Sequence, residues 1–230
     1  MSNRKGAIVT QSLLRLGAIA GPIYVFVVVG QVLTRDGFDI TRHPVSVLAN
    51  GPFGWIQVLN FLVVGTFVTL AGLGLRQAMK SGPGHVWGPM LVTAFGIGLI
   101  GSGVFPADPF DGFPPGTPAG NAADISTSGI LHFAFGGIAF VSLSAACLVF
   151  SRRYSHLLNR GMAIFSAATG VLYLVAFVSV AASEGAMWAN LALTAAVLLG
   201  WIWLTLLTSA TDVQLSSLGE RNVSPATGAP

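Results

Sequence analysis

The segment that decides the fold is GILHFAFGGIAFVSLSAACLVF, from Gly129 to Phe150. It holds no Asp, Glu, Lys or Arg, and most of its residues are apolar. An α-helix needs about 20 predominantly apolar residues to cross the hydrocarbon core of a bilayer. The segment is long enough for such a crossing, and we therefore predict a transmembrane helix here.

Five further segments are also predominantly apolar, and none has a charged residue in its middle. The other structure that satisfies its backbone in lipid is a closed barrel, whose strands alternate polar and apolar residues. Runs such as Phe61-Leu62-Val63-Val64 do not alternate, so the sequence predicts an all-α, polytopic six-helix bundle. The five segments are Leu16 to Leu33, Gly54 to Leu75, Trp87 to Val104, Met162 to Ala182 and Trp188 to Thr208.

The composition agrees with this prediction and excludes several other classes of protein. Of the 230 residues, 53% are hydrophobic and only 8% are charged, whereas about 25% are charged in an average soluble domain. This excludes an ordinary cytosolic enzyme, a nucleic-acid-binding domain and a disordered protein. Because Cys147 is the single cysteine, a disulfide framework is excluded as well. We expect a multi-pass protein of the cell (plasma) membrane.

The basic residues predict the orientation of the bundle. Lys and Arg accumulate in the cytoplasmic segments of membrane proteins. With both termini in the cytoplasm, Arg35 and Arg42 are the only two of the eleven Lys and Arg residues on the outer side. We therefore predict a cytoplasmic segment over 1–15, a six-span domain over 16–209 and a disordered cytoplasmic tail over 210–230.

Two long segments, 34–53 and 105–128, connect helices on the predicted outer side. Long connections of this kind are usually functional or disordered. In the second of them, Phe110 and Phe113 lie among several prolines. Phenylalanines between stiff prolines are suited to cover an apolar pocket, so we predict that the two segments form a lid.

Polar side chains gather at the same predicted level of the membrane. Such groups are costly there unless they pair or face a cavity, so their cluster is the candidate site. The predicted ligand-binding residues are His43, Asp108, His132, Glu184, Phe110 and Phe113, and the candidates for catalysis are His43, Ser46, Asp108, His132 and Glu184.

Two kinds of catalysis would fit this cluster, and both would make the protein an outer-face hydrolase or transferase. His43 and His132 could ligate zinc with Asp108 or Glu184 as third ligand, since catalytic zinc takes three protein ligands and a water. A Ser46–His132–Asp108 triad is the other arrangement. The sequence lacks both the His-Glu-x-x-His and the Gly-x-Ser-x-Gly motif, so whether the protein is an enzyme stays open and we lean towards no.

The remaining hypotheses are a structural plug, a transporter and a binding protein. In the plug, the outer loops fold over the bundle without chemistry. A small membrane transporter or transporter subunit is the runner-up. Against it, the polar residues in the middle of the spans are uncharged hydroxyl residues such as Thr66 and Ser142. We predict binding, with processing left open, of a lipid or apolar small molecule in a pocket open to the outer leaflet.

Small residues four apart, such as Gly17 and Gly21, predict close helix packing within the bundle or in a homodimer.

The chain also resembles a family of bacterial and archaeal multi-span membrane proteins that is catalogued as domain of unknown function 998. One block is Thr41-Arg42-His43-Pro44-Val45-Ser46-Val47-Leu48 with the run from Gly51 to Phe61, and the other is Gly103 to Pro109 with Gly129-Ile130-Leu131-His132. The resemblance covers about residues 16 to 206. It implies a six-helix membrane protein without implying an activity, and it favours His43, Ser46, Asp108, His132 and Glu184.

Overall fold

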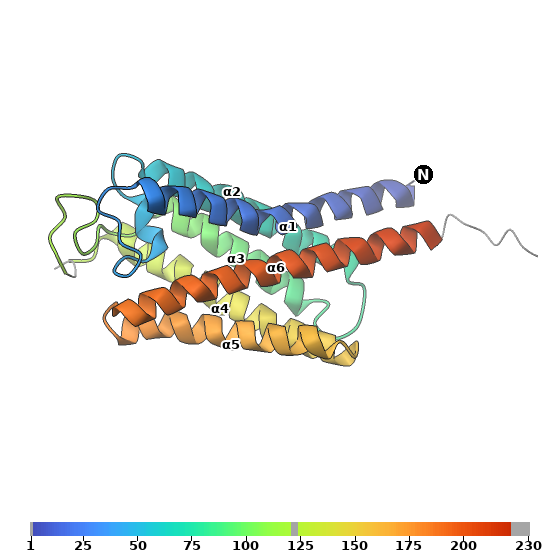
Figure 1. Ribbon diagram of the computed structural model, residues 1–230. Helices are drawn as coiled ribbons and strands as arrows, with labels where there is room; N and C mark the ends of the chain where they lie inside the picture. The colour runs from blue at the N-terminus through green and yellow to red at the C-terminus, as the bar shows by residue number, and fades with distance from the viewer. Residues whose placement is uncertain (1, 121–123, 222–230) are drawn as a thin grey trace, which may run out of the picture.

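The computed structural model describes residues 2–120 and 124–221, and these form one bundle of six long α-helices (Figure 1). All six are long and apolar enough to cross a membrane, which confirms the all-α, six-span prediction. A short 3₁₀-helix, η1, lies between the first two. The helices are α1 (Ser2–Thr34), η1 (Val45–Ala49), α2 (Gly54–Ala78), α3 (Trp87–Val104), α4 (Thr127–His156), α5 (Arg160–Ala182) and α6 (Met187–Arg221).

The helices form a closed ring. Each packs mainly against its neighbours in sequence, and α1 packs against α6. At one end of the ring, here called the loop end, lie the connections 35–53 and 183–186 and the described residues 105–120 and 124–126 of the connection between α3 and α4 (Figure 1). At the opposite end, here called the terminal end, lie the start of α1, the end of α6 and two shorter connections.

The outer surface of the ring is apolar along the helices. Phe26 is 81% exposed, Leu33 78% and Ile164 70%. Exposure of such a surface to water is unfavourable in free energy, whereas lipid chains solvate it. The chain is therefore a multi-pass membrane protein.

Glycines allow neighbouring helices to approach closely, as the small-residue spacing predicted. A Cβ on Gly65 of α2 would lie 2.8 Å from the carbonyl oxygen of Gly96 in α3. A Cβ on Gly17 of α1 would lie 2.6 Å from the Cβ of Ala71 in α2. These glycines are therefore used for packing inside one bundle, and the homodimer stays a prediction.

The last helix continues further than the sequence indicated. Residues 210–221, which we expected in a disordered tail, are instead the final turns of α6, and 222–230 lie outside the described residues. Contacts with α1 explain the continuation. Arg15 and Asp212 form an ion pair of 3.0 Å, and the Gln11 amide donates to the Ser216 hydroxyl at 2.8 Å.

A buried polar seam joins α1 and α2 near the loop end. The Gln31 amide donates to Gln57 Oε1 at 2.8 Å, and the Asn60 amide donates to the Tyr24 carbonyl at 3.3 Å. Gln57 Nε2 and Asn60 Oδ1 have no partner among the described residues. Because an unpaired buried polar group costs about 1–3 kcal/mol, this seam is a less stable part of the helix packing.

Candidate functional site

A cavity of about 560 Å³ lies inside the ring at the loop end. Its volume falls in the range of about 300–1,000 Å³ that is typical of pockets for one small molecule. Residues from all six helices and from the connections at the loop end line it. The cavity therefore belongs to the whole bundle.

Aromatic side chains form the deep part of the cavity. Trp201 contacts Tyr24 and Phe95, with ring centroids 4.9 and 5.8 Å apart, and Phe140 stacks on Phe177 at 4.2 Å. Trp201 lies 14 residues after the start of α6 at Met187, or about 21 Å along the helix at 1.5 Å per residue. The cavity thus extends deep into the apolar bundle.

The mouth of the cavity lies between α4 and α5. Phe133 on α4 and Ile125 just before this helix line the cavity and are 60% and 58% exposed. On the opposite side, Ala181 and Glu184 line it and are also exposed. Nearer the terminal end the two helices touch, because a Cβ on Gly170 would lie 2.8 Å from the Ser144 carbonyl oxygen. The helices therefore diverge towards the loop end and open the cavity sideways.

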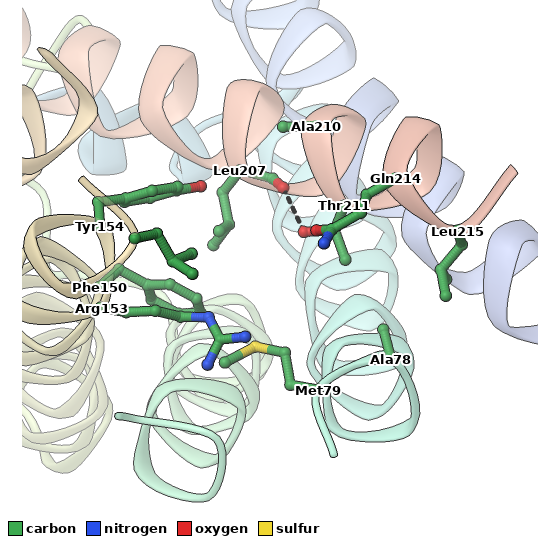
Figure 2. A pocket seen from close by; sticks show the side chains of 11 residues that line it. Ala78, Met79, Phe150, Arg153, Tyr154, Leu207, Ala210, Thr211, Gln214 and Leu215 are labelled. Atoms are coloured by element: carbon green, nitrogen blue, oxygen red, sulfur yellow. Dashed lines mark hydrogen bonds between the residues drawn. The ribbon is translucent and has the colours of Figure 1, made fainter. Parts of the chain in front are cut away.

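A second, smaller cavity lies at the terminal end and is separate from the first. Its volume is about 130 Å³, and it lies between α2, α4 and α6, with Met79, Phe150 and Gln214 among its lining residues (Figure 2). The two cavities share no lining residue. Between them, Leu143 and Leu204 are at most 1% exposed, so an apolar layer closes the large cavity towards the terminal end.

The start of α4 fixes the second loop beside the mouth. Ser126 caps the helix, because its hydroxyl accepts the Gly129 N–H at 3.0 Å. The same hydroxyl donates to Asp108 Oδ1 at 2.5 Å, and the Ser126 N–H donates to Asp108 Oδ2 at 3.0 Å. The Ser128 hydroxyl donates to the Pro106 carbonyl at 2.8 Å. A carboxylate at a helix N-terminus is favoured by the helix dipole, so Asp108 is held at the rim of the cavity.

The hydrogen bonds of His132 define its tautomer. This residue lines the cavity, is 6% exposed, and its Nδ1 lies 3.1 Å from the Ser102 carbonyl and 3.0 Å from the Phe105 carbonyl. Because both partners are acceptors, Nδ1 carries the proton and satisfies the end of α3. Nε2 then holds a lone pair, and it has no partner among the described residues. His132 therefore offers the cavity one hydrogen-bond acceptor.

Phe113 lies in a small apolar core within the lid and does not line the cavity. It is fully buried with Val47, Leu48 and Ala107. The Arg35 guanidinium covers its ring at 5.2 Å from the centroid, and burial lowers the pKa of that guanidinium. This core gives the two loops an apolar interior of their own, so Phe113 supports the lid.

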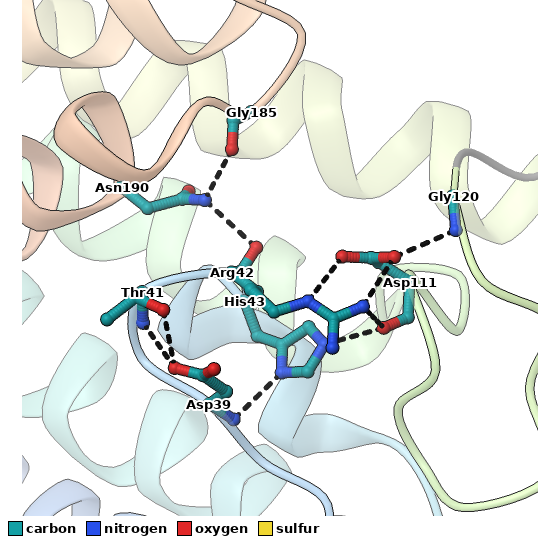
Figure 3. A network of polar contacts seen from close by, with 8 residues as sticks. All are labelled: Asp39, Thr41, Arg42, His43, Asp111, Gly120, Gly185 and Asn190. Carbon is teal, nitrogen blue, oxygen red and sulfur yellow. Dashed lines mark hydrogen bonds and ion pairs between the residues drawn. The ribbon is translucent and has the colours of Figure 1, made fainter.

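His43 connects the two loops of the lid (Figure 3). It is 1% exposed. Its Nδ1 accepts the Asp39 N–H at 2.9 Å, and its Nε2 donates to the Asp111 carbonyl at 2.9 Å. Because backbone groups occupy both ring nitrogens, neither is available to a metal ion or a ligand in this arrangement.

An ion pair and an amide complete the contacts of the lid. Arg42 reaches both carboxylate oxygens of Asp111, at 2.9 and 2.8 Å (Figure 3). This pairing, helped by the Gly120 N–H, lowers the pKa of Asp111, and it raises the pKa of Arg42. The Asn190 amide of α6 donates to the carbonyls of Arg42 and Gly185, at 2.9 Å each. The contacts of His43, Arg42, Asp111 and Asn190, here called the lid clamp, therefore join three connections of the loop end.

The structure separates the predicted site residues into two groups. Ser46, Asp108, Phe110, His132 and Glu184 line the cavity, whereas His43 and Phe113 lie inside the lid. No group of three or more His, Cys, Asp and Glu side chains suited to a metal ion occurs in 2–120 and 124–221. The proposed zinc ligands His43, His132 and Asp108 are therefore not brought together.

The hydrogen bonds of a catalytic triad are not present either. A triad needs its acid to orient the histidine through Nδ1. His132 Nδ1 instead donates to two backbone carbonyls, and both oxygens of Asp108 accept hydrogen bonds from Ser126. The hydrolase hypothesis thus stays a prediction without support from this geometry.

Two features of the site were missed from the sequence. The aromatic floor was missed because Tyr24, Phe140 and Trp201 lie in helices that are apolar on every side, where no periodicity marks the inner face. Asn190 was missed although it is a polar residue near the predicted outer end of the last span. Its position was the signal, because a polar amide at that depth needs a partner.

Comparisons with known proteins identify a family and no activity. A family model described as "Protein of unknown function (DUF998)" matches residues 18–210. No curated protein and no solved structure matches the chain.

Proposed function

Because the chain belongs to the DUF998 family, whose function is unknown, we propose a function from the geometry, namely that it binds an apolar or amphiphilic lipid in the large cavity. The observation that carries the proposal is a cavity of about 560 Å³ with an aromatic interior and a mouth between two membrane-spanning helices. An apolar cavity that opens sideways from such a bundle receives its ligand from the lipid phase.

The lid favours a binding site over a solvent-filled vestibule. The lid clamp joins the connection 35–53 to residues 105–120 and to α6 at the loop end of the bundle. The exposed apolar side chains of Phe133 and Ile125 line the mouth, so an apolar ligand has a route into the cavity from the lipid phase. Burial of a lipid chain against these apolar walls contributes a favourable free energy of about 25 cal/mol per Å² of apolar surface removed from water.

The proposed orientation places the loop end outside the cell. It follows from the excess of Lys and Arg at the terminal end. The mouth then opens towards the outer leaflet of the plasma membrane. A carrier would also need a route to the other side, and the apolar layer at Leu143 and Leu204 offers none in this conformation.

Two glycines of α4 allow a matched test of the proposal. Gly136 lines the cavity, and a Cβ there would meet only Ser102 Oγ, at 3.9 Å. Gly137 does not line it, and a Cβ there would meet nothing within 4 Å. Gly136→Leu therefore fills the cavity without a backbone clash, and Gly137→Leu is the control with the same chemical change.

The experiment is native mass spectrometry of the purified protein after release from a mild detergent. We expect wild type and Gly137→Leu to retain a lipid-sized mass and Gly136→Leu to retain several-fold less. Equal retention by the two variants, or a wild-type chain that retains no lipid, would overturn the proposed function.

A further inference from the structure

The polar groups of the large cavity are concentrated near its mouth and lid. Ser46, Asp108, His132 and Glu184 belong to the loop end, whereas the deep part is aromatic and contains no charged side chain. A ligand that satisfies both regions is an amphiphile, with its apolar chain in the deep part and its polar head near the lid. This step rests on the proposed function and concerns the chemistry of the head.

His132 lies in the polar part of the cavity, where the head of the ligand would lie, and acts there as a hydrogen-bond acceptor. His132 is more than nine-tenths buried, its Nδ1 proton is used by the end of α3, and its Nε2 lone pair is unpartnered among the described residues. A lone pair in an apolar cavity is satisfied by an N–H or O–H donor. The head group must therefore be able to donate a hydrogen bond.

The charged side chains that line the polar part of the cavity are carboxylates. Asp108 and Glu184 both line the cavity, and no Lys or Arg of the described chain does so. Both oxygens of Asp108 are engaged by Ser126, whereas the Glu184 carboxylate makes neither a hydrogen bond nor an ion pair within residues 2–120 and 124–221. Like charges disfavour a carboxylate or phosphate head here, and a positive charge is favoured next to Glu184.

We propose that the large cavity selects single-chain amphiphiles with a positively charged head that donates hydrogen bonds, the chemistry of a long-chain primary amine. The ammonium group gives one N–H to His132 Nε2 and pairs with the Glu184 carboxylate. The chain extends along the aromatic walls towards Trp201. An alcohol of equal length satisfies the histidine alone, and a fatty acid satisfies neither group.

The test uses three probes with the same chain, namely dodecylamine, dodecanol and dodecanoate. Each is titrated into the full-length protein in a non-ionic detergent, and binding is followed by native mass spectrometry. We expect affinity to fall in the order amine, alcohol, carboxylate, with about tenfold or more between the first and the last.

Two variants separate the contributions of Glu184 and His132 to the affinity for the polar head of the probe. Glu184→Gln removes the charge, and we expect about threefold to tenfold weaker binding of dodecylamine with dodecanol unchanged. His132→Asn keeps an N–H near the Nδ1 position and removes the Nε2 lone pair, so binding of both probes weakens. Asp36→Asn is the control, because Asp36 is an exposed acid of the loop end that does not line the cavity.

The outcomes separate the head-group proposal from the proposed function. If dodecanoate binds as tightly as dodecylamine and Gly136→Leu abolishes both, the charge assignment is wrong and the lipid cavity remains. The assignment is equally overturned if Glu184→Gln and Asp36→Asn weaken the amine to the same extent. If Gly136→Leu leaves the binding of every probe unchanged, the cavity is not the binding site and both proposals fail.

Discussion

Residues of one chemical type have different roles at the loop end, and their hydrogen bonds distinguish them. His43 and His132 both have low exposure, yet backbone groups occupy both nitrogens of the first and only one nitrogen of the second. The sequence placed both in one site because both lie near the predicted outer surface. Only the tertiary arrangement shows that one is a lid residue and the other faces the cavity.

Removal of the His43 ring should therefore destabilise the lid. In His43→Ala, the Asp39 N–H loses its partner, while the Asp111 carbonyl keeps only the Arg42 guanidinium at 3.1 Å. An unsatisfied buried polar group costs about 1–3 kcal/mol, and the space left by the buried His43 ring adds to that loss. We expect a loss of about 2 kcal/mol or more in unfolding free energy, measured by denaturant or thermal unfolding in detergent. The control is His156→Ala, whose exposed side chain should change stability by less than about 0.5 kcal/mol. Full stability of His43→Ala together with lost lipid retention would place His43 in the binding site instead.

At the scale of helices, the glycines show how much of the fold a sequence predicts. The six spans were predictable because the bilayer sets a minimum apolar length. The Ser126 cap was predictable because its signal is local. The partners of each glycine were not, because every helix is apolar on all sides and the sequence does not mark which face meets which neighbour.

The packing of α3 against α4 depends on Gly98. A Cβ there would lie 2.8 Å from both the Ala139 Cβ and the Phe135 carbonyl oxygen. We expect Gly98→Leu to lower the unfolding free energy by about 1–3 kcal/mol or more through overpacking. Gly137→Leu should be neutral or stabilising by up to about 1 kcal/mol, because leucine favours a helix over glycine. Equal stability of the two variants in thermal unfolding would contradict this close approach.

At the scale of the whole molecule, the lid clamp explains why the site was only partly predictable. Arg42 and Asp111 are 69 residues apart in sequence, and no local pattern connects them. The apolar runs predicted which segments leave the membrane, and the phenylalanines among prolines in 105–128 predicted that these segments form a lid. The pairing of Arg42 with Asp111 forms only when the ring brings the connections of the loop end together.

Cys147, the single cysteine, reports whether reagents can reach the apolar layer between the two cavities. Cys147 is fully buried and lies in α4 between the two cavities. In a binding protein with one mouth, we expect Cys147 to resist a maleimide from either side of the membrane and to react after unfolding in SDS. Ser81→Cys, at an exposed position of the terminal end, is the positive control for the reagent. Labelling of Cys147 in the folded protein would favour the transporter hypothesis.

The contact between the first and last helices has a consequence for biosynthesis. Because α6 packs between α5 and α1, the five helices made earlier by the ribosome form an open arc whose concave side is accessible to lipid. Residues of α6, including Leu193, Val197 and Trp201, supply one wall of the large cavity. Insertion of the final helix thus completes the wall of the cavity. Under the proposed function, a first lipid would enter the cavity before α6 is inserted, and later lipids would enter between α4 and α5.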